Sequence, residues 1–515
     1  MRNAIEGVGF LLSRVPERQE RGTGRDVFSS STATCYPRCV KPFHIYNSLS
    51  RSVEEFHPQD PPNVSLYSCG PTVYLPPHLG NMRAYLFVDT LKRALMFNGY
   101  RVKHVMNVTD VGHMTDDADS GEDKIEKTAR AQHKSPREIA DYYLGLFIRD
   151  MDALKILRPD ITSRATDHIA EMIELTARIS KNGYAYVTAS GVYFDVEKWR
   201  GPNKIGRLSR QSLDEQASAQ RLEHSPDKKS PHDFALWVLG KPGHLMQWDS
   251  PWGRGYPGWH IECSAMSMKY LGETIDIHTG GTDHIPVHHE NEIAQSESAT
   301  GHPFARYFVH NAFLVERPGT KISKSAGKFP VLDDLIASGL NPLAFRLLCF
   351  GAKYRSELVL SDGIQAAQKN YDYIAEFVRQ MREDGARASE DSAWADEYRE
   401  RFNDAINNDL NTPQALAVVL DLIGEAYRRG DHQIWNTLRA LDTVVGLDVD
   451  AIRTSSQASR KAEFPPEIAK LIADRREARR TRNFKRSDEL RAELEHHGYD
   501  VRDTREGSSY LPRGS

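Results

Sequence analysis

The chain has 515 residues, 71 acidic and 67 basic side chains, and a formal net charge of -4. This length exceeds what one hydrophobic core organises, and the near-neutral charge means that a nucleic acid would have to be bound by a local basic patch. No apolar run reaches the roughly 20 residues of a membrane span, and the few, unevenly spaced cysteines argue against a disulfide framework. We therefore expect a multidomain cytoplasmic protein with no membrane partner.

Residues 1–41 differ in composition from the rest of the chain. Arginines alternate with Glu17, Glu20 and Asp26 before a Ser/Thr-rich stretch. Mitochondrial targeting peptides are poor in acids, so this pattern predicts a disordered N-terminal extension, with organellar import as the alternative. Cys35 and Cys39 have no later partner pair and are interpreted as incidental.

The first regular unit is a strand, a helix and a second strand. The apolar run 64–69 predicts a buried strand, and apolar residues at helical spacing predict a helix that ends before Gly99, followed by a strand over 100–108. His78-Leu79-Gly80-Asn81 falls in the first turn of that helix. Unpaired backbone N–H groups and the helix dipole favour phosphate there, so we expect the motif to bind ATP.

The middle of the chain predicts an insertion, because a charged helical stretch from 124 to about 182 is followed by a polar, β-rich stretch to 229. A helix over 260–271 and a strand over 274–278 then resume the first pattern. The chain becomes mostly helical after the polar loop Lys321-Ile322-Ser323-Lys324-Ser325. Alternating strands and helices predict an α/β fold with a Rossmann-type parallel sheet.

A candidate metal site combines two cysteines with a histidine-rich segment. His288 and Glu292 are four residues apart and share a helix face, but His289 is three residues from Glu292 and would serve as well. With Cys69 and Cys263 these side chains offer two sulfurs, one nitrogen and one oxygen, which suits zinc. The alternative is a chance cluster in which the cysteines act as small apolar residues.

The last fifty residues carry a basic stretch. On a helix its cations would cover much of one side, as in a surface that follows a phosphate backbone. The alternative is a solvated helix whose cations pair with Glu477 and Asp488. The candidate nucleic-acid contacts are Arg475, Arg476, Arg479, Arg480 and Lys485.

Taken together, these motifs resemble the cysteinyl-tRNA synthetases, a family of class I aminoacyl-tRNA synthetases. The resemblance runs from about 43 to 510 and is strongest in Tyr67-Ser68-Cys69-Gly70-Pro71, in the stretch 257–266 and in the stretch 288–296. It implies activation of L-cysteine by ATP to cysteinyl-adenylate, with release of pyrophosphate, and transfer to the 3′ terminal adenosine of tRNA-Cys. It also implies one Zn²⁺ per subunit, Mg²⁺ with the ATP, and a monomer.

The resemblance also implies roles for individual residues. It selects His288 over His289, giving the zinc ligands Cys69, Cys263, His288 and Glu292. It implies that developing phosphate charge is stabilised by His78, Asn81, Lys321 and Lys324. Further ATP contacts would be Gly70, Thr72, Gly80 and Asp283, and the substrate cysteine would meet Trp259, His278 and Thr109. Asn81 stands where many members have histidine, and Ile322 replaces the usual methionine.

The implied organisation has seven parts. They are an extension (1–41), the first half of the catalytic domain (42–135), a connective insertion (136–245), the second half with the zinc site (246–310), a lysine-loop and stem-contact region (311–365), a helical tRNA-binding bundle (366–460) and a small anticodon-binding module (461–515).

Two alternatives share the same core. One is the cysteine ligase of mycothiol biosynthesis, which uses a sugar amine as acceptor and should lack the final tRNA-binding region. The other is a non-catalytic zinc-binding paralogue, against which the intact Lys321 and Lys324 argue. Persulfide synthesis, attributed to some members, is matched only loosely here by Lys124 and Lys127.

Overall fold

The computed structural model describes residues 41–111, 123–200, 206–211, 227–240, 244–317, 320–321, 330–383, 390–452, 466–481, 483–497, 499–504 and 507–512. The predicted N-terminal extension, apart from residue 41, lies outside these ranges, as do Cys35, Cys39 and Lys324. No helix in the described ranges combines the length and apolarity needed to cross a membrane.

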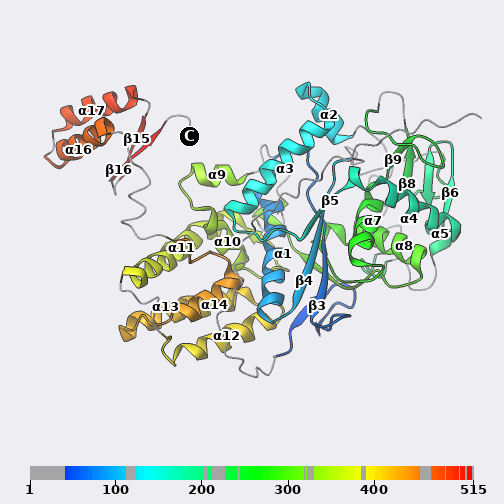
Figure 1. Ribbon diagram of the computed structural model, residues 1–515, viewed down its shortest axis with the longest axis horizontal. Coiled ribbons are helices and arrows are strands. Elements are labelled where there is room, and N and C mark those ends of the chain that lie inside the picture. The colour runs from blue at the N-terminus through cyan, green and yellow to red at the C-terminus, as the bar shows by residue number, and fades with distance from the viewer. Residues whose placement is uncertain are drawn as a thin grey trace, which may run out of the picture. The chain divides into compact units, whose positions relative to one another are not determined.

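Within these ranges a five-stranded sheet with only parallel pairings forms the centre of the catalytic part (Figure 1). Its spatial order is β11-β10-β3-β4-β5. The strands are β3 (Asn63–Ser68), β4 (Arg101–Val108), β5 (Ile161–Arg164), β10 (Ile275–Gly281) and β11 (Ala305–Asn311). Chain order reverses between β3 and β10, so the carboxyl ends of these two strands flank the crevice in which such sheets bind ligands. The predicted Rossmann-type sheet is confirmed.

Helices connect the strands of this sheet. Helix α1 (Leu79–Phe97) follows β3, and α2 (Lys124–Gln132) and α3 (Pro136–Ala153) lie between β4 and β5. Helix α3 begins with a capping box of Ser135 and Glu138 and with proline at its first turn. Because β5 pairs with β4, the first half of the sheet continues to Arg164. The predicted boundary at 135 is therefore too early.

The insertion forms its own antiparallel sheet in the order β6-β7-β8-β9. Its elements are α4 (Ile169–Lys181), β6 (Ala185–Val187), β7 (Gly191–Phe194), α5 (Val196–Trp199), β8 (Phe234–Leu239) and β9 (Gly255–Pro257). Phe194 and Phe234 stack with ring centroids 4.9 Å apart in a core that also contains residues of α7 (Trp259–Leu271) and α8 (His288–Thr300). The insertion thus packs against the helices that carry the candidate metal ligands.

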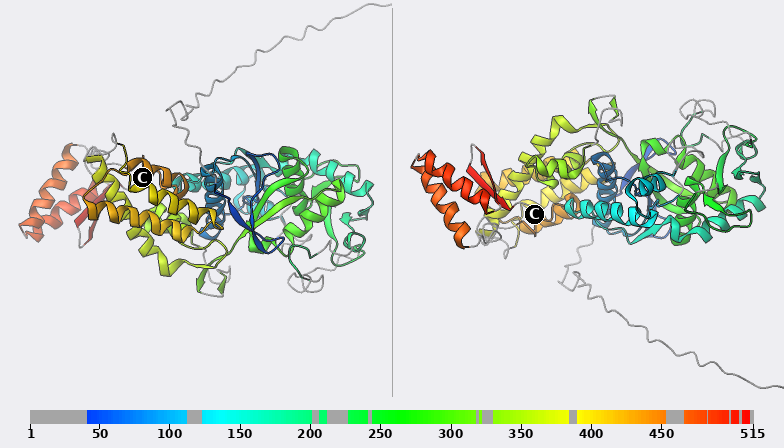
Figure 2. Two further views of the ribbon diagram at one scale, coloured as in Figure 1. Left: turned by 90° about the horizontal axis from the view of Figure 1, so that it is seen from below. Right: turned by 90° about the horizontal axis from the view of Figure 1, so that it is seen from above.

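Short strands flank the sheet before the chain turns helical. They are β1 (His44–Asn47), β2 (Ser52–Glu55), β12 (Leu314–Arg317), β13 (Thr320–Lys321) and β14 (Leu358–Val359). Helices α9 (Leu332–Ala337) and α10 (Pro342–Phe350) precede β14, and α11 (Leu360–Glu383), α12 (Ala395–Asn407), α13 (Thr412–Arg429) and α14 (Trp435–Val445) follow it. Figure 2 shows α11 to α14 side by side as a bundle. Beyond residue 465, α16 (Pro466–Arg480), α17 (Phe484–His496) and β15 (Tyr499–Thr504) share a small apolar core, and β16 (Gly507–Pro512) pairs with β15.

Candidate active site

The first sequence motif caps the N-terminus of helix α1. The Nδ1 atom of His78 accepts a hydrogen bond from the Asn81 N–H at 3.2 Å, and Asn81 Oδ1 accepts one from the His78 N–H at 3.2 Å. Since Nδ1 is an acceptor, a neutral His78 ring carries its proton on Nε2. Asn81, which replaces the more common histidine, thus fixes the orientation of His78 at the positive end of the helix dipole.

Two glycines allow close approaches around this crevice. A Cβ on Gly70 would lie 1.6 Å from the carbonyl oxygen of Asn107, and the Gly70 N–H donates to Asn107 Oδ1 at 2.7 Å. A Cβ on Gly80 would lie 3.0 Å from the His78 ring. The turn after β3 therefore crosses directly against the end of β4, which holds Cys69 at the edge of the crevice.

The four predicted metal ligands converge at this edge. Cys69 directly follows β3, Cys263 lies on α7, and His288 and Glu292 lie one turn apart on α8. One ligand atom from each side chain lies within 4.8 Å of the others. Cys263, His288 and Glu292 are buried, and Cys69 is half-buried. Residues nearly two hundred positions apart thus meet because α7 packs against both β3 and α8.

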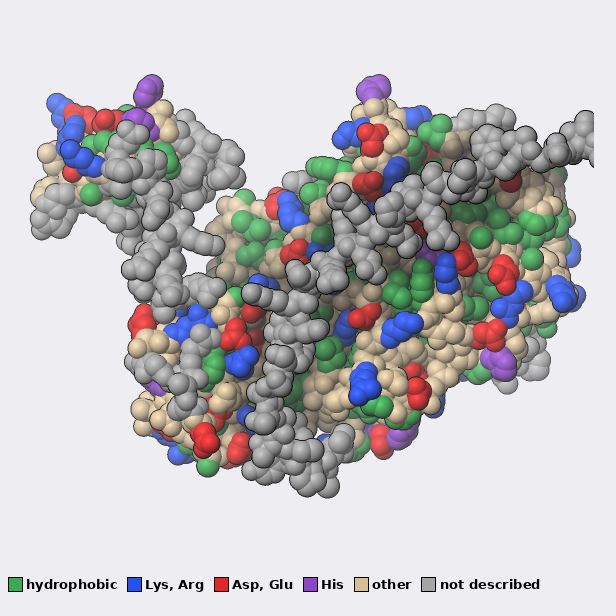
Figure 3. Space-filling view, viewed as in Figure 1, with side chains coloured by type: hydrophobic (Ala, Val, Ile, Leu, Met, Phe, Trp, Pro, Cys, Tyr) green, Lys and Arg blue, Asp and Glu red, His purple; other side chains and the backbone are tan. Residues whose placement is uncertain are grey.

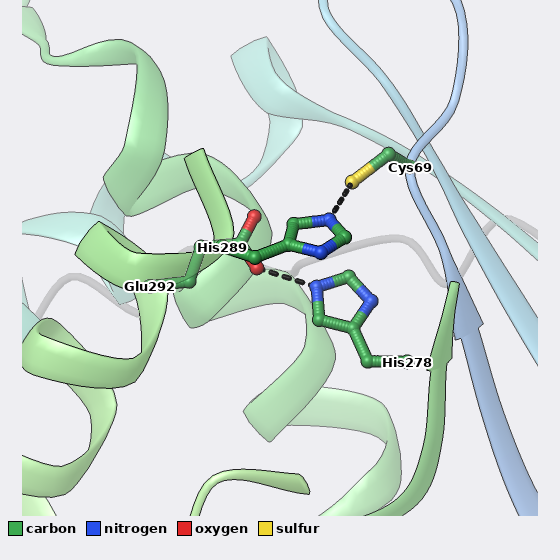
Figure 4. A group of neighbouring side chains, drawn as sticks. All are labelled: Cys69, His278, His289 and Glu292. Carbon is green, nitrogen blue, oxygen red and sulfur yellow. Dashed lines mark hydrogen bonds and ion pairs between the residues drawn. The ribbon is translucent and has the colours of Figure 1, made fainter. Parts of the chain in front are cut away.

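A second group with metal-binding geometry overlaps the first and shares Cys69 and Glu292 with it. In this group, which Figure 4 shows, His289 Nε2 lies 3.4 Å from Cys69 Sγ, and His278 Nε2 bonds to Glu292 Oε2. Distance alone therefore does not choose between His288 and His289. The other ring nitrogens do not choose either, because His289 Nδ1 lies 2.8 Å from His310 Nε2 and His288 Nδ1 lies 2.7 Å from His260 Nδ1.

The pKa shifts of the two cysteines in the cluster are compatible with a bound cation. The pKa of Cys69 lies well below its usual range, because interactions with Cys263 and His284 outweigh the opposing effect of burial. The pKa of Cys263 is raised, because it interacts with Cys69 and is buried. Ionised Cys69 thus opposes the ionisation of Cys263, and a bound divalent cation would favour the thiolate form of both.

The carboxylate of Glu292 also fits a metal. Burial raises its pKa, but His278 and His288 outweigh this effect and hold the pKa below the ordinary value. Glu292 Oε1 lies 2.8 Å from His288 Nε2, yet it has no hydrogen-bond partner among the described residues. The donor set of two sulfurs, one nitrogen and one oxygen suits zinc.

The residues predicted to meet the substrate cysteine surround this cluster. The indole of Trp259 stacks on His288, with ring centroids 4.4 Å apart and planes inclined by 25°. His278 is fully buried and its Nε2 bonds to Glu292, which favours a role in orienting that carboxylate over direct contact with substrate. The Thr109 hydroxyl donates to Glu262 Oε2 at 2.9 Å and accepts from Asn107 Nδ2 at 3.1 Å.

Sequence reasoning assigned no role to Asn107 or Glu262. They form a chain of hydrogen bonds from Gly70 through Asn107 and Thr109 to Glu262, the residue before Cys263. Burial raises the pKa of Glu262 well above its ordinary value. Thr109 and Glu262 are 153 positions apart, so no local pattern could have paired them.

Of the remaining residues predicted to contact the nucleotide, the structure places Thr72, Asp283 and the backbone of Lys321. Thr72 forms a backbone bridge with Thr109, and Asp283 is exposed in the short helix Thr282–His284 directly after β10. The backbone of Lys321, in β13, pairs with that of Val315 in β12. The side chain of Lys321 and all of Lys324 lie outside the described residues.

The basic C-terminal stretch is only partly the surface that was predicted. Arg475 is fully buried in α16, so the expectation that it contacts tRNA is wrong for the side chain as packed here. Lys485 is exposed on α17, and Figure 3 shows basic side chains on that module. The side chains of Arg476, Arg479 and Arg480 lie outside the described residues.

Comparisons with known proteins identify the family of the chain. Residues 55–370 match the catalytic domain of class I tRNA synthetases of the C type, residues 401–449 the DALR domain, and residues 461–510 the anticodon-binding domain of cysteinyl-tRNA ligases. The cysteine–tRNA ligase of Treponema denticola is 42% identical over 483 residues, 89% of this chain and 97% of that protein. The Chlorobaculum tepidum cysteine–tRNA ligase is 40% identical over 487 residues, 91% of this chain and 98% of that protein.

Among solved structures, the chain shares its fold with distant class I synthetases. Mycobacterium tuberculosis methionyl-tRNA synthetase in complex with methionyl-adenylate superposes with a TM-score of 0.53 at 16% identity, covering 75% of this chain and 89% of that chain. The leucyl enzyme agnB2 LeuRS of Agrobacterium radiobacter K84 gives a TM-score of 0.55 at 11% identity, with coverage of 77% and 86%. These structures show the fold alone, whereas the relatives matched over nearly their whole length show the family. The chain belongs to the cysteine–tRNA ligase family of class I aminoacyl-tRNA synthetases.

Proposed function

We propose that the enzyme selects L-cysteine with a Zn²⁺ ion held by Cys69, Cys263, His288 and Glu292. The observation that carries this proposal is the convergence of these four ligand atoms within 4.8 Å of one another at the carboxyl edge of the sheet. When bound, zinc would offer the substrate thiol a coordination position and favour its ionised form.

Such a site answers a recognition problem. Cysteine and serine differ by one atom, and an apolar pocket separates near-isosteres by only about a hundredfold. An alcohol ionises less readily than a thiol and is a poorer ligand in a sulfur-rich site. Discrimination at this step would leave no need for an editing site. Trp259 supports the arrangement, because it stacks on His288 and limits the orientations of that ring.

We assign His278 and His289 to the support of this centre rather than to its ligands. His278 Nε2 bonds to Glu292, and His289 bridges Cys69 to His310, whose Nδ1 lies 2.8 Å from Ser48 Oγ. Such outer hydrogen bonds orient metal ligands. Burial lowers the pKa of His289 to about 4, so this ring stays neutral near pH 7.

For adenylate formation we propose that the chain mainly positions ATP. The α1 N-terminus, with His78 oriented by Asn81, would stabilise phosphate charge together with Lys321, Lys324 and Mg²⁺. Gly70, Thr72, Gly80 and Asp283 line the turn and strand ends where the rest of the nucleotide would bind. The carboxylate of cysteine then attacks the α-phosphorus and pyrophosphate leaves, a reaction that needs orientation more than acid–base chemistry.

We propose that tRNA-Cys lies along the helical bundle and the C-terminal module of a monomeric enzyme. Exposed Lys485, with Arg476, Arg479 and Arg480, would contribute phosphate contacts, and the buried Arg475 would support the module from within. This surface favours synthesis of cysteinyl-tRNA over the sugar-amine ligase, because residues 461–510 match an anticodon-binding domain.

The test is a metal analysis paired with activity on the full chain. We expect about one zinc per chain and cysteine-dependent pyrophosphate exchange that is lost on chelation and restored by zinc. Serine should support no measurable exchange. Full exchange in chelated protein, with metal shown to be absent, would contradict the proposal.

A further inference from the structure

A buried ion-pair centre lies in the protein interior away from the proposed zinc site. It consists of Asp89 and Arg93 on α1 and Arg346 on α10, and the side chains of Asp89 and Arg346 are essentially inaccessible to solvent. Asp89 Oδ2 accepts from Arg346 Nη2 at 2.5 Å and from Arg93 Nε at 2.8 Å. Its Oδ1 accepts from the Leu157 N–H at 2.8 Å.

The two guanidinium groups of the ion-pair centre bind the C-terminal ends of two helices. Arg346 donates from Nε to the Val445 carbonyl at 2.6 Å and from Nη1 to the Leu154 carbonyl at 3.0 Å. Arg93 donates to the Thr443 carbonyl at 3.0 Å and to the Lys155 carbonyl at 2.7 Å. These acceptors lie at the ends of α14 and α3, where carbonyl groups lack helical partners and the helix dipole is negative.

Further contacts hold the ion-pair centre against the C-terminal end of α14. Gly446, directly after α14, has φ +76°, and a Cβ at that position would lie 2.1 Å from Arg346 Nη2. Lys155 reaches Asp448 beyond the same helix end at 2.9 Å. Burial raises the pKa of Asp89, but Arg346 and Arg93 outweigh this effect and hold it below its ordinary value. The carboxylate is therefore charged, with each oxygen engaged.

The position of the centre in the fold suggests what it does. Asp89 lies on α1, the helix that begins at the nucleotide motif His78, whereas Arg346 lies on α10, which follows the lysine loop. Helix α14 belongs to the segment that matches the DALR domain, and Figure 1 shows α14 and α10 beside α1. One carboxylate, through its two arginines, thus links α1 and α10 to the end of α14 in the proposed tRNA-binding bundle.

We propose that the Asp89–Arg346 pair, with Arg93, is a positioning centre that holds the tRNA-binding bundle in register with α1 during transfer of cysteine to tRNA. A buried ion pair contributes little net stability compared with apolar residues of the same size, but it tolerates few geometries. Such a pair is therefore suited to fixing the orientation of the bundle relative to α1. Because a displacement of about 1 Å at a reacting group can lower a rate on the order of a hundredfold, the register of the bundle matters for transfer.

The test separates the two half-reactions in the full-length enzyme. In Arg346→Lys the charge opposite Asp89 remains, but lysine cannot donate to the Val445 and Leu154 carbonyls together. We expect pyrophosphate exchange per titrated active site within about twofold of the parent, and kcat/KM for tRNA charging lower by on the order of tenfold. Zinc content should be unchanged, which separates this proposal from the ligand assignment.

The matched control is Arg83→Lys. Like Arg346, Arg83 is a buried arginine, and it lies on α1. Its guanidinium donates to the carbonyls of Phe313 and Ser356 rather than to the bundle. We expect this variant to lower thermal stability and to change exchange and charging in equal proportion. Gly446→Ala offers a second route, because its Cβ displaces the Arg346 guanidinium without removing a charge. Should Arg346→Lys fail to fold, Gly446→Ala must show the split.

An equal loss of exchange and charging per active site in Arg346→Lys and Gly446→Ala would overturn the proposal. So would a change confined to the melting temperature. Either result would mean that the centre serves stability alone.

Discussion

Cys263→Ser is expected to abolish zinc binding and to lower cysteine-dependent pyrophosphate exchange by roughly a hundredfold or more. Serine keeps the size of the side chain but supplies an alcohol that ionises poorly, so one of two sulfur ligands is lost. Cys263 is buried on α7, so the substitution leaves the surface unaltered. Zinc per chain by elemental analysis and the exchange rate measure the effect.

The control for this experiment is Cys349→Ser. Cys349 is a half-buried cysteine on α10 and belongs to neither group with metal-binding geometry among the described residues. It should retain zinc and exchange activity. Full zinc occupancy with full exchange in Cys263→Ser would remove that residue from the ligand set, and loss of zinc in both variants would point to general damage to the fold.

Lys324→Ala is expected to lower the rate of adenylate formation by on the order of a hundredfold to a thousandfold, with little change in zinc content. The lysine is assigned to the phosphate charge that develops as pyrophosphate leaves, so its effect should fall on kcat rather than on the KM for cysteine. Single-turnover formation of cysteinyl-adenylate, measured without tRNA, isolates this step.

Lys328→Ala supplies the comparison in the same loop. It removes the same charge four residues further on, at a position with no proposed contact, and should leave the rate within about twofold of the parent. Equal losses in the two variants would show that the loop contributes a general positive field instead of a specific contact by Lys324.

The parts of the fold that the sequence predicted are those encoded by local pattern. The apolar run ending at Cys69 and the helical spacing up to Gly99 gave β3 and α1 nearly to the residue, because burial and capping are decided within a few neighbours. Strand β5 was placed in the insertion instead, since a four-residue strand after two charged helices gives little periodic signal. Its membership of the sheet depends on pairing with β4.

The residue types of the site could be predicted from the sequence, but the hydrogen bonds that surround them could not. Helical spacing paired Glu292 with a histidine, residue type suggested Cys69 and Cys263 as further ligands, and the fold brings the ligand atoms of all three residues together. The choice between His288 and His289 depended on family resemblance, and both rings indeed reach the cluster. The bond between Thr109 and Glu262 joins distant segments, so local sequence carries no trace of it.

The helical surfaces show a further limit of sequence patterns. Cations at helical spacing predicted an exposed basic face that includes Arg475, but that side chain is buried in the core of its module. Spacing identifies which residues share a face, but only packing decides whether that face meets water. For the same reason the sequence did not reveal the buried pair of Asp89 and Arg346, because each looks like an ordinary charged residue of its helix.

The most direct test of the zinc assignment is X-ray absorption at the zinc edge of the full-length enzyme, with and without substrate. Ligation by Cys69, Cys263, His288 and Glu292 predicts two sulfur neighbours, rising to three with L-cysteine and remaining at two with L-serine. A shell with one sulfur and two nitrogens would instead indicate Cys69, His278, His289 and Glu292. That shell, or a spectrum that cysteine leaves unchanged, would contradict the account.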